Sequence, residues 1–283
     1  MNTVSQTFNW SRFVAALRKE VVENNRTILF SIIGVFAILT IFMLLGNLIL
    51  HTPMEVQMEM ADKVPQTVVY VILAFVMCIM ASMAFKGLTN KEGRTALMMS
   101  PSSTLEKFLV NVLIYVVAMF VLFFACAQLA DLVRIAVLKP FEDSNFVVPG
   151  PINFLKTFSF TVSEGRNSMD PEVQTWMTTS MIIGTISSAA IYFLGSVLWP
   201  RLSLLKTWAV IFVIQTVTII LLIVFINVLG DPKAFGRWLA DFIKHGNFFT
   251  VMFAFYTVLT IVGFALSWIL FKRKDVVSLK WWK

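Results

Sequence analysis

Six apolar runs without a single Asp, Glu, Lys, Arg or His constrain this chain more than any other feature. They are Thr27–Leu50, Val64–Phe85, Phe108–Ala130, Trp176–Trp199, Thr207–Leu229 and Phe248–Phe271. An α-helix rises 1.5 Å per residue, so about 20 apolar residues cross a hydrocarbon layer roughly 30 Å thick. We therefore predict an all-α membrane protein, a six-transmembrane-helix bundle that forms one domain over residues 1–283.

The composition agrees with lipid as the main solvent. Hydrophobic residues make up 58% of the chain and charged residues only 14%, and the mean hydropathy is +0.81, which excludes an ordinary soluble domain. The net charge of +7 comes from residues beside the apolar runs, so we expect no nucleic-acid partner. Cys78 and Cys126 both lie inside apolar runs and indicate neither a disulfide framework nor a metal site.

The distribution of basic residues predicts the orientation in the membrane. With the N-terminus inside, the cytoplasmic pieces would be 1–26, 86–107, 200–206 and 272–283. These pieces hold 15 of the 23 Lys and Arg residues but only 5 of the 16 acidic ones. Positive residues resist translocation, so we expect both termini and these loops on the cytoplasmic side of a multi-pass protein.

Before the first apolar run, the sequence has a helical pattern of apolar residues. Trp10, Phe13, Val14, Leu17 and Val21 recur at helical spacing among charged neighbours. This predicts an amphipathic helix in the cytoplasmic interface. Such a helix can be a simple anchor or an element that moves with a cytoplasmic partner, and the pattern does not separate the two.

The loop 86–107 contains two helix-start signals. Thr89 with Glu92, and Ser103 with Glu106, each have capping-box spacing. The first box precedes about two potential helical turns, which Pro101 should end because proline disfavours helix in the residue before it. We predict a short cytoplasmic helix here whose apolar stripe needs a headgroup layer or a protein groove to cover it; a solvated turn is the alternative.

On the outer side, two segments stand out. Residues 231–246 begin with Asp-Pro, end near Gly246 and have an amphipathic pattern, which predicts a helix on the outer leaflet between the last two spans. This helix would either only seal the bundle or take a direct part in the protein's function. Residues 131–175 form a loop long enough for a small outer cap, to which no chemistry can be assigned.

Several kinds of chemistry have no signal in the sequence. The six spans lack the ionisable groups that membrane pumps and ion-coupled transporters use, and no P-loop motif occurs. We expect no catalytic residue, no metal and no cofactor in this chain. Gly184 with Ser188, and Gly263 with Ser267, have the spacing that permits close helix contact.

The topology and one loop sequence together resemble a type-2 ABC transporter permease, a membrane subunit that lacks its own ATPase domain. The resemblance rests on the six spans, the amphipathic first helix and the stretch Asn90-Lys91-Glu92-Gly93-Arg94-Thr95-Ala96-Leu97-Met98-Met99-Ser100-Pro101. In that family an acidic residue precedes Gly-Thr and a leucine-rich turn that ends in Pro. Here Arg94 separates Gly93 from Thr95, and Met98 and Met99 replace part of the leucine run.

The resemblance implies a function and partners. It implies a permease subunit of an ATP-driven ABC transporter, with export as the expected direction, in a prokaryotic plasma (inner) membrane. Its partners would be a separate ABC ATPase and a second permease subunit, in a homodimer or a heterodimer. The residues implied to couple to the ATPase are Glu92, Gly93, Arg94, Thr95, Leu97 and Met98. A non-transporting membrane scaffold or assembly factor, and an ATPase-independent transporter, are the alternatives.

Overall fold

The structure is a computed structural model. It describes residues 8–49, 63–90, 92, 93, 95, 99, 101–141, 150, 151, 171–229, 235–237, 242 and 247–276. Over these residues it contains eight α-helices and no strand, in agreement with the predicted all-α class.

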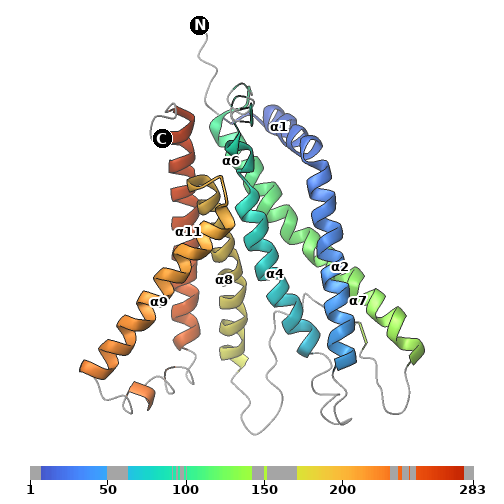
Figure 1. The fold of residues 1–283 in the computed structure, drawn as a ribbon, viewed down its shortest axis with the longest axis vertical. Helices are drawn as coiled ribbons and strands as arrows, with labels where there is room; N and C mark the ends of the chain where they lie inside the picture. The colour runs from blue at the N-terminus through green and yellow to red at the C-terminus, as the bar shows by residue number, and fades with distance from the viewer. Residues whose placement is uncertain are drawn as a thin grey trace.

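The long helices follow the predicted apolar runs closely. They are α2 (Asn25–Ile49), α4 (Lys63–Met83), α7 (Met119–Leu138), α8 (Pro171–Leu198), α9 (Ser203–Leu229) and α11 (Asn247–Val276). Two shorter helices, α1 (Trp10–Glu23) and α6 (Thr104–Val112), precede α2 and α7. Helix α2 packs along α7, α4 along α8, and α8 along α11, whereas α9 diverges from α8 beyond their shared turn (Figure 1).

Five helical segments are long and apolar enough to cross a membrane: Asn25–Gly46, Thr104–Phe141, Thr175–Leu198, Ser203–Asn227 and Asn247–Arg273. Helix α4 contains a shorter apolar stretch, Val68–Met83. The chain is thus a multi-pass membrane protein by the length and hydropathy of its helices, with five of the six predicted spans confirmed. The second span stays a prediction.

The third span differs from its predicted bounds, Phe108–Ala130. Helix α6 continues through a π-helical segment, η2 (Leu113–Ala118), into α7 and a final 3₁₀ turn, η3 (Lys139–Phe141). The first residues of the predicted loop 131–175 are therefore helical. Charge does not end this helix because Asp131 and Arg134 are both buried and pair at 2.7 Å within it.

Helices α8 and α11 meet through the small residues singled out in the sequence. The ring of Tyr256 lies against Gly184, and Ala190 lies against Gly263, where an added Cβ would be 3.2 Å from the alanine methyl. Ser267, one turn further along α11, is fully buried. Close backbone approach through small residues is the usual way membrane helices gain contact area.

The four segments predicted to share one side of the membrane lie at one end of the bundle. Helix α1, the start of α6, the turn between α8 and α9 and the C-terminal end of α11 are all at the top of Figure 1. The relative sidedness of these segments agrees with the count of basic residues. Which side of the membrane they face stays a prediction.

Candidate functional site

The segment between α4 and α6 starts and ends on a cluster of aromatic rings. Phe85 lies at the start of the segment and Phe108 lies in α6 just after it, and both pack on Phe193 of α8, with ring centroids 5.1 and 5.5 Å from that of Phe193. On α11, the ring centroid of Phe271 lies 4.9 Å from that of Phe85, and the ring centroid of Trp268 lies 5.3 Å from that of Phe108. The two ends of the segment are thereby held against α8 and α11.

The first part of the segment is a 3₁₀ turn, η1 (Lys86–Thr89). Gly93 lies so close to this turn that a Cβ on it would overlap the carbonyl oxygen of Gly87. The Thr89 hydroxyl donates to the carbonyl of Pro200 at 3.1 Å, which links the segment to the turn between α8 and α9. In that turn Leu202 has a positive φ of 56° and is 67% exposed.

The structure describes three of the six residues implied to contact an ATPase. Glu92, Gly93 and Thr95 are helical, as is Met99. Glu92 and Thr95 are exposed and Gly93 is half-buried. Arg94, Leu97 and Met98 lie outside the described residues. The exposed fraction of Met99 is 78%, so Met99 is an uncovered apolar side chain.

The second predicted capping box is confirmed. The Ser103 hydroxyl accepts from the backbone N–H of Glu106 at 3.3 Å, and the Glu106 carboxylate accepts from the N–H of Ser103 at 2.8 Å. This closes the start of α6. The first box, at Thr89 and Glu92, stays a prediction.

Glu106 also joins α6 to the N-terminal helix, which the sequence did not predict. Its second carboxylate oxygen accepts from the backbone N–H of Asn9 at 2.9 Å and from the Arg12 guanidinium at 3.2 Å. The Glu106 side chain is fully buried, whereas 23% of the Arg12 side chain is exposed. Capping-box spacing was the only sequence signal at Glu106, and it points to a local role rather than to a contact 94 residues away.

Helix α1 is amphipathic as predicted, but its apolar residues divide between two surroundings. Asn9 caps its start by accepting from the N–H of Ser11 at 3.0 Å. Phe13 is buried against the core, while Trp10 and Val14 are exposed. The helix is therefore fixed to the bundle along one line and leaves apolar side chains uncovered along another, as expected for a helix in a membrane interface.

The predicted outer helix 231–246 falls mostly outside the described residues. Phe235–Arg237 and Phe242 are helical, and Arg237 is exposed. Nearer to α7, Arg134 donates to the carbonyl of Gly150 at 3.1 Å, which ties one point of the predicted loop 131–175 to the bundle.

Of the residues implied to contact an ATPase, Glu92, Gly93 and Thr95 are thus helical, Glu92 and Thr95 are exposed, and Gly93 lies against the η1 turn. Comparisons with protein-family models, with curated proteins and with solved structures find no match for this chain. Helix length and hydropathy identify it as a multi-pass membrane protein.

Proposed function

We propose that this chain is the permease subunit of an ATP-driven ABC transporter and that residues 90–99 dock on a separate ATPase subunit. The observation that carries the proposal is the exposed helical stretch around Glu92 at the α1 end of the bundle. Phe85 and Phe108, on either side of this stretch in the sequence, pack on Phe193 of α8, and Gly93 lies against Gly87 of η1. A force applied near Glu92 would therefore be transmitted to α8 through Phe85 and Phe108.

The mechanism follows from these connections. Two permease halves, alike or different, would pack together, and closure of two ATPase subunits would press on residues 90–99 of each half. The force would pass through Phe85 and Phe108 to α8 and α11, and through Glu106 to α1. Movement of the halves would then open a path for the substrate, with export as the proposed direction and ATP hydrolysis confined to the partner.

Helix α9 supports the part of the proposal that concerns a second half. The apolar window of α9 is not buried within the chain, and its side chains from Phe212 to Phe225 are exposed. Lipid or a second permease half can cover that surface, because lipid tails and the apolar face of another helix both pack against apolar side chains.

Gly93 and Gly87 offer a matched pair of substitutions to test the docking assignment. Gly93→Ala forces the short helix away from the Gly87 carbonyl, whereas a Cβ at Gly87 meets nothing within 4 Å. When the full chain is purified from its native membrane in mild detergent, we expect an ABC ATPase to co-purify with the wild type and with Gly87→Ala. Gly93→Ala and Glu92→Ala should retain at least several-fold less ATPase.

Equal retention of the ATPase by all four proteins would remove residues 90–99 from the interface. Reconstitution in proteoliposomes separates the alternatives. Flux without any ATPase would indicate an ATPase-independent transporter, and no flux with or without an ATPase would indicate a scaffold or assembly factor. Flux that requires both the ATPase and ATP is the expected result.

A further inference from the structure

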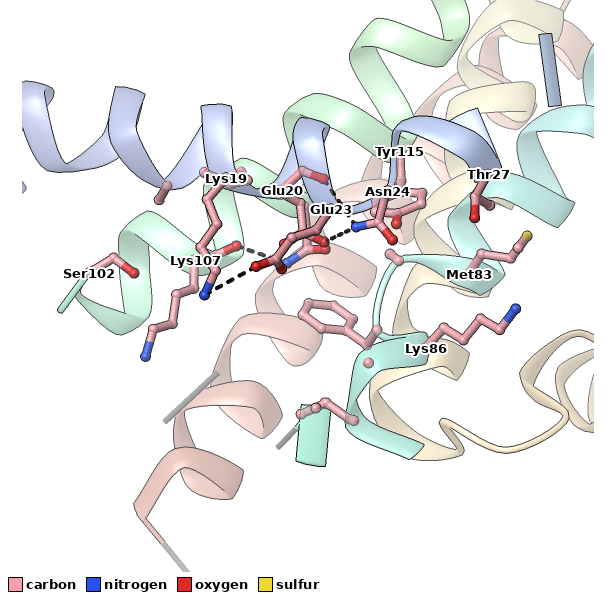
Figure 2. A pocket seen from close by; sticks show the side chains of 18 of the residues that line it. Lys19, Glu20, Glu23, Asn24, Thr27, Met83, Lys86, Ser102, Lys107 and Tyr115 are labelled. Atoms are coloured by element: carbon pink, nitrogen blue, oxygen red, sulfur yellow. Dashed lines mark hydrogen bonds and ion pairs between the residues drawn. The ribbon is translucent and has the colours of Figure 1, made fainter. Parts of the chain in front are cut away.

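A cavity of about 360 Å³ with charged and apolar lining residues lies under the C-terminal half of α1. The end of α4 with η1 forms a second wall, and α6 with the π-helical segment η2 forms a third (Figure 2). Its charged lining consists of the carboxylates Glu20 and Glu23 and the lysines Lys19, Lys86 and Lys107. Volumes of a few hundred Å³ suit a small ligand or a headgroup, and the lining has charges of both signs.

Asn111 gives the cavity an unsatisfied acceptor. Its side chain lines the cavity and only 5% of the residue is exposed. The amide nitrogen donates to the carbonyl of Lys107 at 3.0 Å, but the amide oxygen has no hydrogen-bond partner within the described part of the chain. A buried carbonyl oxygen is stabilised by a donor, so this oxygen favours an occupant that carries N–H or O–H groups.

The carboxylates of Glu20 and Glu23 add negative charge from the α1 wall. Glu20 is half-buried and accepts from the Asn24 amide at 2.8 Å. Burial, and then the neighbouring Glu23, raise the pKa of Glu20 above its ordinary value, and they outweigh the Asn24 hydrogen bond and the nearby Lys19, which lower it. Lys19 lies 3.7 Å from Glu23. An occupant with a positive charge would stabilise the ionised form of Glu20.

Together these acceptors match a primary ammonium, which has three N–H donors and a positive charge. Lysines lie beyond them: Figure 2 shows Lys107 on one side of Glu20 and Glu23 and Lys86 on the other. A group that carries both an ammonium and a phosphate therefore offers a partner to each sign of charge. Helix α1, with its exposed Trp10 and Val14, brings the cavity to the depth of lipid headgroups.

The π-helical segment η2 also lies beside the cavity. Tyr115 lines the cavity from within the π-helical turns, and such turns are rare and frequently occur at functional sites. We propose that the cavity binds a phosphoethanolamine group, with the ammonium against Glu20, Glu23 and Asn111 and the phosphate toward a lysine, and that a phospholipid of the adjacent leaflet supplies it.

The test compares two phospholipids that differ only in the amine. The full chain in detergent is titrated with phosphatidylethanolamine or with phosphatidylcholine of the same acyl chains, and binding is followed by native mass spectrometry. We expect phosphatidylethanolamine to bind about tenfold more tightly, because trimethylation removes every N–H donor and a charge-assisted hydrogen bond corresponds to about that factor.

Two variants address the cavity and one serves as a control. Asn111→Leu removes the unpartnered oxygen, and Glu20→Gln removes a carboxylate while keeping its shape. Each should reduce the preference to about twofold or less, whereas Lys206→Gln, an exposed change on α9 away from the cavity, should keep it. Glu20→Gln lies on an interfacial helix, so it tests the site even if Asn111→Leu does not fold.

Equal binding of the two lipids by the wild type would overturn the proposal, and so would a preference that survives both cavity variants. Soluble glycerophosphoethanolamine identifies the source of the group. If it competes only at far higher concentration than the lipid, the membrane is the source. If it competes at the same concentration, the cavity binds a water-soluble phosphoethanolamine compound, and the assignment to a lipid is wrong.

Discussion

At the scale of single residues, Glu106 has two structural roles, one within its own helix and one between helices. One carboxylate oxygen closes the first turn of α6, and the other receives the Asn9 backbone and the Arg12 guanidinium. A buried carboxylate is tolerated when its lone pairs are filled in this way. The same side chain thus makes the docking of α1 depend on the start of α6, immediately after the segment proposed to contact an ATPase.

Glu106→Ala should destabilise the protein by about 1–3 kcal/mol, because it leaves buried donors without an acceptor. The expected result is a lower unfolding midpoint in detergent, together with faster proteolysis between α1 and α2. Glu23→Gln is the matched control, since it removes the exposed partner of the pair with Lys19 at 3.7 Å and should cost under about 1 kcal/mol. Equal midpoints for the two variants would contradict the joining role of Glu106.

Glu20 predicts a dependence of stability on pH. Burial first and Glu23 second raise the pKa of Glu20 above 4.5 in the folded protein. The folded state therefore keeps this proton to a higher pH than the unfolded state does, and the corresponding stability is lost as the pH rises from about 4.5 through the raised pKa. Glu20→Gln should flatten this part of the curve of unfolding midpoint against pH, and an unchanged slope would count against it.

At the scale of elements, α8 connects three of the other long helices. It packs on α4, α9 and α11, and it does so through small residues on several faces. Gly195 faces the side chain of Thr207 on α9, and Ala190 faces Gly263 on α11. Helices α8 and α9 touch near their shared turn and then diverge (Figure 1), and Gly195 lies where they touch.

Gly195→Ala should open the contact between α8 and α9, because the new methyl would overlap the Thr207 side chain. We expect a loss of about 1–3 kcal/mol, as for other overpacked sites, measured as a lower unfolding midpoint. Gly34→Ala on α2 is the control, since nothing lies within 4 Å of its Cβ position. Adding Thr207→Ala to Gly195→Ala should recover part of the loss, and a double variant as unstable as the single one would refute the contact.

At the scale of the whole molecule, the connections gather at one end of the bundle. Helix α1, the segment around Glu92, the turn at Pro200 and the end of α11 share that end (Figure 1), and hydrogen bonds join α1 to α6 and Thr89 to Pro200. The distribution of basic residues predicts that this end faces the cytoplasm. A partner at this end would contact segments from nearly the whole length of the chain.

Thiol labelling in intact cells and in inverted vesicles tests this orientation. In a background without Cys78 and Cys126, a membrane-impermeant reagent should modify Met99→Cys only in inverted vesicles, because Met99 is 78% exposed at the predicted cytoplasmic end. Gly150→Cys should react in intact cells. Labelling of Met99→Cys from outside would reverse the orientation and remove the basis for contact with a cytoplasmic ATPase.

The sequence by itself determined the features whose causes are local. Hydrocarbon excludes charge, so the uncharged runs located the long helices to within a few residues, except at the C-terminal end of the third, which extends to Phe141. The spacing of Ser103 and Glu106 was enough for a cap. Only the tertiary structure decided where buried charge is tolerated and which distant groups meet. Asp131 continues a helix because Arg134 neutralises it there, and Arg12 reaches Glu106 because folding brings the start of α1 to the start of α6. Hydropathy depends on composition along the chain, whereas pairing of buried groups depends on positions that exist only once the helices have packed.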